Sequence, residues 1–281
     1  MSAPHLIAQV CFGPARGVKA AIPAGASLTV GSDPSAGLSL PHDAQLAPVH
    51  LELRWDGARA RVHHRGGAAT FTCLAGQVVH EAALGHGAWL RAGGTDLTVH
   101  VEARTPAVAR TPADAARSER ALAGLRRTPG PWFAILDLAR DERLAVLLRE
   151  SVDACGPLFD GVEGDRLAEA APQLVALGPD SRLADDLVRE GHGLRWGVFL
   201  ASRLSLVELR RHLRRFLLAR LAGAEGRVFF RYYDPGVLQV YLASCDADER
   251  AAWFGAAVDR FVGEDEAAAD GWWRATAAGV E

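Results

Sequence analysis

The sequence predicts a multidomain protein, with an N-terminal all-β sandwich followed by a C-terminal α/β domain. Residues 1–103 consist of short runs of alternating apolar and polar side chains, separated by Gly, Pro and Asp at sandwich-like spacing. From residue 131 onward, strand-like runs alternate with helix-like runs, which is the pattern of an α/β domain. The 281 residues exceed the commonest size of one domain, and 49% of them are hydrophobic, enough to build cores.

The N-terminal domain is predicted over residues 1–103, and a linker is predicted over residues 104–130. The linker contains three Thr-Pro pairs and almost no bulky apolar side chains, although Ala113–Arg127 can form a short helix. The expected strands of the N-terminal domain are Leu6–Cys11, Ser27–Val30, His50–Trp55, Ala60–His64, Val78–Glu81 and Asp96–Glu102.

The C-terminal domain is predicted over residues 131–281. Ser205 with Glu208, and Asp246 with Glu249, have the spacing of capping boxes, in which each side chain satisfies a backbone N–H of the other residue. The expected strands are Trp132–Leu136, Leu174–Leu177, Gly197–Ala201 and Phe229–Tyr233. The expected helices are Glu142–Glu150, a helix from the cap Ser181 to Gly191, one from Ser205 to about Ala222, one from Pro235, and Ala251–Val258.

Residues 229–238, FFRYYDPGVL, form the most informative motif of the chain. Asp234 is a good helix N-cap, and Pro235 fits the first helical turn because it has no N–H to leave unpaired. The motif resembles the FRxYDPRVL signature of the adaptor, or chaperone, family that loads toxins onto the VgrG spike of bacterial type VI secretion systems. Two interpretations stay open for Arg231 and Asp234: a structural corner with an internal ion pair, or a contact with the partner.

The resemblance runs from about Pro131 to Asp265 and includes Arg231, Tyr232, Tyr233, Asp234 and Pro235 of the motif. It implies a non-catalytic adaptor that covers a toxic effector protein and bridges it to a VgrG or PAAR-type spike, with no cofactor. One position departs from the pattern, because the family commonly has Arg after Asp-Pro and this chain has Gly236.

A second resemblance covers about the first 100 residues. The run Val30-Gly31-Ser32-Asp33-Pro34, followed by apolar positions and His50, is similar to forkhead-associated (FHA) domains, which bind phosphothreonine peptides. The family holds the phosphate with arginines and a serine where this chain has Ser32, Ala47 and Pro48. Arginine supplies the charged, forked donors that a dianionic phosphate needs, and these three residues do not. The resemblance therefore implies a degenerate site on an interaction scaffold, with His50 bracing its own loop.

The helix expected from Ser205 carries leucines on one stripe and arginines largely off it. This basic face is either a solvated surface or a contact for an acidic partner. The pair Trp272-Trp273 is a candidate for partner contact or for a closing strand. The possible partner face is thus Arg210, Arg211, Arg214, Arg215, Trp272 and Trp273.

Other function classes find little support. The net charge of −3 does not favour nucleic acid, and no run approaches the roughly 18 apolar residues of a membrane span, so we expect a cytoplasmic protein. The four cysteines and ten histidines show no metal-ligand spacing, and no catalytic motif is present. We therefore expect no metal, no cofactor and no enzymatic activity. The alternatives are a phosphothreonine-dependent signalling module and, third, an enzyme of unknown chemistry.

Overall fold

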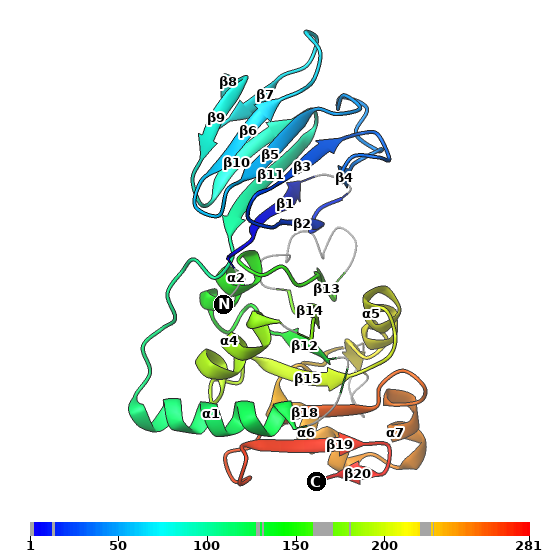
Figure 1. Ribbon diagram of the computed structural model, residues 1–281. Coiled ribbons are helices and arrows are strands. Elements are labelled where there is room, and N and C mark those ends of the chain that lie inside the picture. Colours follow the sequence, from blue (N-terminus) through cyan, green and yellow to red (C-terminus); the bar gives the residue numbers. More distant parts are fainter. Residues whose placement is uncertain are drawn as a thin grey trace. The chain divides into compact units, whose positions relative to one another are not determined.

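The computed structural model describes residues 3–12, 15–127, 130, 132–159, 171–179, 181–219, 226 and 228–281. The chain divides into two compact units (Figure 1). The first comprises Met1–Pro106 with Arg149–Val152, and the second comprises Ala107–Leu148 with Asp153–Glu281. In the described part of the chain, no helix is both long enough and apolar enough to span a membrane.

The first unit is a β-sandwich, as predicted. One sheet has the order β2-β1-β11-β10-β7-β8 and the other has the order β4-β3-β5-β6-β9. One core lies between them, with Leu6 and Leu97 from the first sheet and Leu51 and Val62 from the second. The strands are β1 (Leu6–Phe12), β2 (Lys19–Ile22), β3 (Ala26–Gly31), β4 (Leu38–Ser39), β5 (Leu51–Trp55), β6 (Ala60–His64), β7 (Thr72–Leu74), β8 (Gln77–Val79), β9 (Glu81–Leu84), β10 (Ala88–Ala92) and β11 (Thr95–Val101).

One expected strand of the sandwich is in fact two. The run Val78–Glu81 divides at His80, because β8 pairs with β7 in one sheet and β9 pairs with β6 in the other. The chain therefore changes sheets at this residue. Alternation along the sequence cannot show such a change, because both strands alternate in the same way.

The second unit has one antiparallel sheet with the order β13-β14-β12-β15-β18-β19-β20, and β16 pairs with β17 in a separate ribbon. The strands are β12 (Trp132–Leu136), β13 (Cys155–Pro157), β14 (Gln173–Leu177), β15 (Gly197–Ala201), β16 (Leu218–Ala219), β17 (Val228–Phe229), β18 (Arg260–Glu264), β19 (Trp272–Thr276) and β20 (Gly279–Val280). The helices are α1 (Pro112–Arg126), α2 (Glu142–Arg149), α4 (Arg182–Gly191), α5 (Leu206–Arg214), α6 (Pro235–Ser244) and α7 (Ala247–Trp253).

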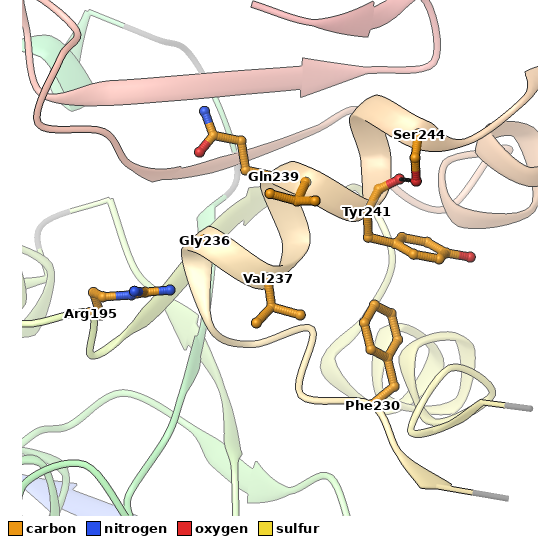
Figure 2. A pocket seen from close by; sticks show the side chains of 8 residues that line it. Arg195, Phe230, Gly236, Val237, Gln239, Tyr241 and Ser244 are labelled. Atoms are coloured by element: carbon orange, nitrogen blue, oxygen red, sulfur yellow. Dashed lines mark hydrogen bonds between the residues drawn. The ribbon is translucent and has the colours of Figure 1, made fainter. Parts of the chain in front are cut away.

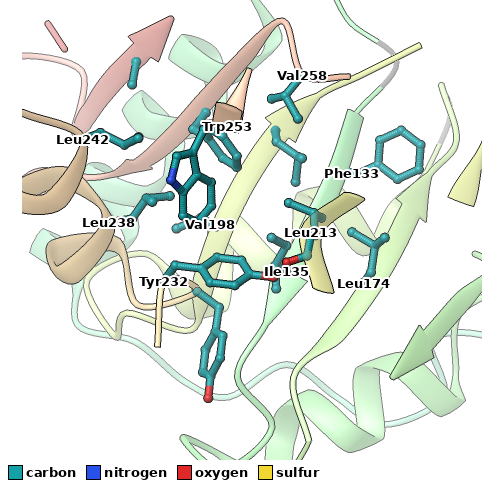
Figure 3. Packing of buried hydrophobic residues seen from close by; sticks show 14 of the residues in the cluster. Phe133, Ile135, Leu174, Val198, Leu213, Tyr232, Leu238, Leu242, Trp253 and Val258 are labelled. Carbon is teal, nitrogen blue, oxygen red and sulfur yellow. Dashed lines mark hydrogen bonds between the residues drawn. The ribbon is translucent and has the colours of Figure 1, made fainter. Parts of the chain in front are cut away.

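Both faces of this sheet are covered by helices. Successive side chains of a strand point to opposite faces. Phe133 and Ile135 of β12 therefore join a core with α5, α6 and α7, part of which is shown in Figure 3. Ala134 and Leu136 join a second core with α1, α2 and α4. The strands β12 and β15 are buried on both sides, which explains their almost continuous apolar sequences.

The short helix expected over Ala113–Arg127 is present, as α1, but the segment 104–130 is not merely a linker. Most of it is the helix α1, which belongs to the second unit and buries Ala121, Leu122 and Leu125 in the second core. The Trp272 indole N–H donates to the Ala121 carbonyl at 2.7 Å. The composition of the segment is poor in apolar residues, but these few share one face of the helix. Their shared face is enough to anchor α1 on the core. Composition alone does not show which residues share a face.

Three further elements end earlier than expected. The helix that begins at the Ser205 capping box ends at Arg214, and its expected extension to Ala222 reaches residues outside the described ranges. Of the strand expected over Phe229–Tyr233, only Phe229 lies in a strand, at the end of β17. The Asp246–Glu249 capping box is formed, but α7 ends at Trp253 because Gly255 then adopts a positive φ of 47°.

We predict that α1 contributes to the stability of the second unit. Leu122→Ala removes a side chain that is 2% exposed, and such core truncations lower the free energy of unfolding by about 2–5 kcal/mol. Arg120→Ala, on the exposed face of the same helix, should change it by less than about 0.5 kcal/mol. Urea unfolding followed by tryptophan fluorescence measures both. Equal stability of the two variants would show that α1 is not anchored.

Candidate functional site

The FRYYDP motif lies beside the end of one strand of the second unit, β12, and the start of another, β15. Because β12 and β15 are antiparallel, with Leu136 opposite Gly197, the end of β12 lies beside the start of β15. Asp137 follows β12 and donates its backbone N–H to the Trp196 carbonyl at 2.9 Å. The antiparallel pairing therefore brings Asp137 and Trp196, 59 positions apart in the chain, together where the two strands end and begin.

Three arginines and two aspartates form ion pairs at this edge. The Arg231 guanidinium contacts the Asp137 carboxylate at 2.5 Å. Asp234 pairs with Arg140 at 2.6 Å and also with Arg195. Both carboxylates are buried, whereas the Arg231 and Arg195 side chains are 52% and 49% exposed. The five residues are called here the corner cluster.

The internal ion pair expected between Arg231 and Asp234 is not formed. Arg231 follows a short exposed strand instead of ending a buried one, and its side chain reaches Asp137, 94 residues earlier in the chain. Asp234 takes its charged partners from two other loops. Proximity in the sequence suggested the wrong pairing, because the partners come from the neighbouring strand ends.

The predicted helix cap at Asp234 is confirmed. Its carboxylate accepts the backbone N–H groups of Gly236 at 3.0 Å and Val237 at 3.2 Å, and Pro235 occupies the first turn of α6. Burial acts to raise the pKa of Asp234, but the hydrogen bond from Arg195 and the two backbone donors outweigh it. The pKa is therefore lowered, and the charged carboxylate links α6 to the strand ends.

The two tyrosines of the motif are structural. Tyr232 is fully buried among the side chains shown in Figure 3, and its hydroxyl donates to the Leu213 carbonyl at 3.0 Å. Burial raises the pKa of Tyr232 well above its usual value, so the phenol stays neutral. Tyr233 is also buried, and the Arg231 guanidinium lies 5.8 Å from the centre of its ring. The tyrosines hold the motif against the core.

Gly236 leaves room for Arg195. A side chain at position 236 would begin in the space that the Arg195 guanidinium occupies. Arg195 has a positive φ of 56° and pairs with Asp234. This explains why Gly236 suits the position where the resembling family commonly has arginine: an arginine at position 236 would have to displace Arg195.

Most of the residues proposed as a partner face have internal contacts. Arg210 donates to the carbonyls of Pro157 and Phe159, and Arg215 donates to His212 and lies 5.4 Å from the Phe216 ring. Arg214 is partly buried, and Arg211 is exposed on α5. The basic face of α5 is therefore only partly a solvated surface.

The proposed partner contact through Trp272 and Trp273 is wrong, because both side chains are buried. Trp272 is 3% exposed and Trp273 1% exposed, one in each of the two cores. They lie on β19, which pairs with β18 and β20. The alternative interpretation, a strand at this position, is correct, although β19 lies inside the sheet and β20 is its edge strand.

In the loop expected to form a degenerate FHA site, the residues hydrogen-bond to one another. The Ser32 hydroxyl donates to the Leu46 carbonyl at 3.1 Å, and the Ala47 carbonyl accepts from the Ser32 backbone N–H at 3.0 Å. The Pro48 carbonyl accepts from the Asp33 N–H at 3.2 Å. The loop thus satisfies its own polar groups.

His50 braces this loop, as expected. Its Nδ1 accepts the Ala47 backbone N–H at 3.2 Å, so its Nε2 carries the proton and donates to the Phe71 carbonyl at 2.9 Å. The ring is 1% exposed and joins two separate backbone segments. No cluster of possible metal ligands occurs in the part of the chain that the structure describes.

An apolar groove beside the corner cluster was missed by the sequence analysis. It is an open groove of about 720 Å³ along α6, lined by Arg195, Phe230, Gly236, Val237, Gln239, Val240, Tyr241 and Ser244 (Figure 2). The sequence of α6 could have indicated it, because its apolar residues cover more of the helix than the one face that packs on a core.

Glu264 supports the loop that carries Arg195. Its carboxylate accepts the backbone N–H groups of Gly193 at 3.0 Å and Arg195 at 3.1 Å. Burial raises the pKa of Glu264 from an ordinary value of 4.5 to about 7, and the two hydrogen bonds only partly oppose this effect.

We predict that Glu264 makes stability fall as the pH rises. The folded pKa of about 7 exceeds the unfolded value of 4.5. The contribution of Glu264 to stability is therefore fully present below pH 4.5 and is lost as the pH rises through about 7. Glu264→Gln keeps an acceptor but does not titrate. The Tm of the wild type, relative to this variant, should therefore be higher at about pH 5 than at about pH 8. A Tm difference between wild type and variant that is the same at both pH values would contradict the raised pKa of Glu264.

We predict that Arg231 is coupled to Asp137 and not to Asp234. Arg231→Ala leaves a buried carboxylate without its partner, so its cost should be smaller once Asp137→Ala is also present. The coupling free energy in unfolding experiments should be about 1–3 kcal/mol, against less than about 0.5 kcal/mol for Arg231→Ala with Asp234→Ala. The reverse ranking would restore the pairing that the sequence suggested.

We predict that the first unit does not prefer phosphothreonine peptides. The chain should bind a degenerate phosphothreonine library no better than its unphosphorylated twin in a fluorescence titration. The double variant Ser32→Arg/Pro48→Arg supplies two charged donors and should gain a preference for the phosphorylated pool. A micromolar preference in the wild type would contradict the prediction.

Residues 132–252 match a family model described as a domain of unknown function, DUF4123. The match begins at the first residue of β12 and ends within α7. It contains the complete FRYYDP motif and the corner cluster. It also coincides with the stretch on which the adaptor resemblance rests. No curated protein matches the chain.

Solved structures similar to the chain include FHA domains. One comes from a study of phosphothreonine-dependent FHA interactions, with 27% identity and a TM-score of 0.31 over 34% of this chain and 95% of that one. An FHA domain of a hypothetical protein from Arabidopsis thaliana has 21% identity and a TM-score of 0.34 over 39% and 94%. The cytoplasmic domain of the type III secretion sorting platform protein PscD from P. aeruginosa has 25% identity and a TM-score of 0.30 over 38% and 98%.

Proposed function

We propose that this protein is a non-catalytic cytoplasmic adaptor that binds a type VI secretion effector and helps to load it onto a VgrG or PAAR-type spike. The observation that carries the proposal is the family match over residues 132–252, which includes the FRYYDP motif. By resemblance, this motif belongs to the adaptor family. The degenerate FHA sandwich then serves as a second, phosphate-independent interaction module.

The contacts of the ionisable residues support a non-catalytic role. Asp137 and Asp234 are held by arginines, and the Asp141 carboxylate accepts the Trp196 indole N–H at 3.2 Å. Both ring nitrogens of His212 are engaged, one with Arg215 and one with the Trp253 carbonyl. An acid–base catalyst needs a group that can reach a substrate, and these groups are committed to internal bonds.

The test is co-expression with a toxin encoded next to this gene. A stable complex should co-elute on size exclusion, and the toxin should lose solubility or secretion when the adaptor is deleted. Adding the neighbouring spike protein should give a ternary complex. A toxin that is soluble, stable and secreted without this protein would refute the loading role.

A further inference from the structure

Helix α6 has two apolar faces, and the core completely covers only one of them; on the second face, Tyr241 packs partly against the core. Leu238 and Leu242 are completely buried against the sheet. On the other side, Val237, Val240 and Tyr241 follow one another at helical spacing of three and four residues, and Val240 is 71% exposed. A helix at the surface of a domain usually has polar residues on this side, so the second face needs an explanation.

The second face forms one wall of the groove shown in Figure 2. Phe230 and Tyr241 lie side by side, with their ring centres 4.8 Å apart, and Val237 lies on the same wall. Every lining residue belongs to the second unit. The groove thus offers an apolar ridge next to two aromatic rings.

The end of the groove at Arg195 is positively charged. The corner cluster has three arginines but only two aspartates, and both aspartates are buried. The guanidinium of Arg195 is half-exposed although it pairs with Asp234, and among the described residues that line the groove Arg195 is the one with a charged side chain. A ligand of this groove should combine apolar side chains with negative charge.

We infer that the groove binds an acidic amphipathic helix of a partner protein. The ridge on α6 has the spacing that packs into the grooves of another helix, and Arg195 at the end of the groove complements an acidic residue. The inference rests on the proposed function, because it names the kind of effector segment that the adaptor would hold.

The test uses defined peptides and the full-length protein. The probe is a synthetic helical peptide with leucines at i, i+3, i+4 and i+7 and glutamates on its flanks. The controls are the same peptide with lysines in place of glutamates and a scrambled acidic peptide. Fluorescence anisotropy is measured with the wild type and with Val240→Asp. Val207→Asp is the matched control variant, because Val207 is 67% exposed on α5, outside the groove.

The acidic helix should bind the wild type at least about tenfold more tightly than either control peptide, and added salt should reduce this preference. Val240→Asp should weaken binding at least about tenfold, whereas Val207→Asp should change it less than about twofold. Circular dichroism melts should show that both variants stay folded, since both positions are exposed.

Three results would overturn the inference. They are absence of binding, equal binding by Val240→Asp, or tighter binding of the lysine peptide. A dimer that Val240→Asp abolishes would show that a second copy occupies the groove instead. Because the peptides do not depend on the neighbouring toxin, these outcomes are independent of the co-elution test. The co-elution test can therefore refute the loading role without refuting peptide binding in the groove, and the peptide test can refute the groove without refuting the loading role.

Discussion

The Asp234 carboxylate connects the elements of the second unit around the FRYYDP motif. One oxygen caps α6 and contacts Arg195, and the other meets Arg140 at 2.6 Å. A charge buried to this degree is stable only when several donors surround it. The helix, the loop after β12 and the loop before β15 must therefore meet at one place. The apolar outer face of α6 is positioned by the same constraint, so the groove depends on a residue that does not line it.

Local features of the fold could be predicted from the sequence. The caps at Ser181, Ser205, Asp234 and Asp246 all form, because a cap joins residues only two or three positions apart. Strands such as β6, β12 and β15 have the predicted bounds, because their apolar runs are bordered by turn residues. In each case the physical cause lies within a few residues of its effect.

Non-local pairing could not be predicted in the same way. Arg231 contacts Asp137 across 94 positions, and this contact depends on how the segment after β17 packs beside the end of β12. The same limit applies to Trp272 and Trp273. Two adjacent tryptophans near a polar terminus suggested a surface, but β19 lies between two other strands and has a core on each side. Alternation then buries both rings, one on each face.

The loop of the first unit that resembles the phosphopeptide site of FHA domains is held in shape by its own contacts. In the FHA domains that the first unit resembles, arginines at the positions of Ser32 and Pro48 hold the phosphate. Here the same loop is held by bonds from Ser32 to Leu46 and from His50 to Ala47 and Phe71. The bracing histidine is buried and independent of any phosphate, so the loop needs no anion to stay folded. Its exposed surface has Pro48 where the family has an arginine, together with the apolar side chains of Val49 and Phe71. Such a surface favours apolar contact with a protein partner, because it offers few charged donors to a peptide phosphate.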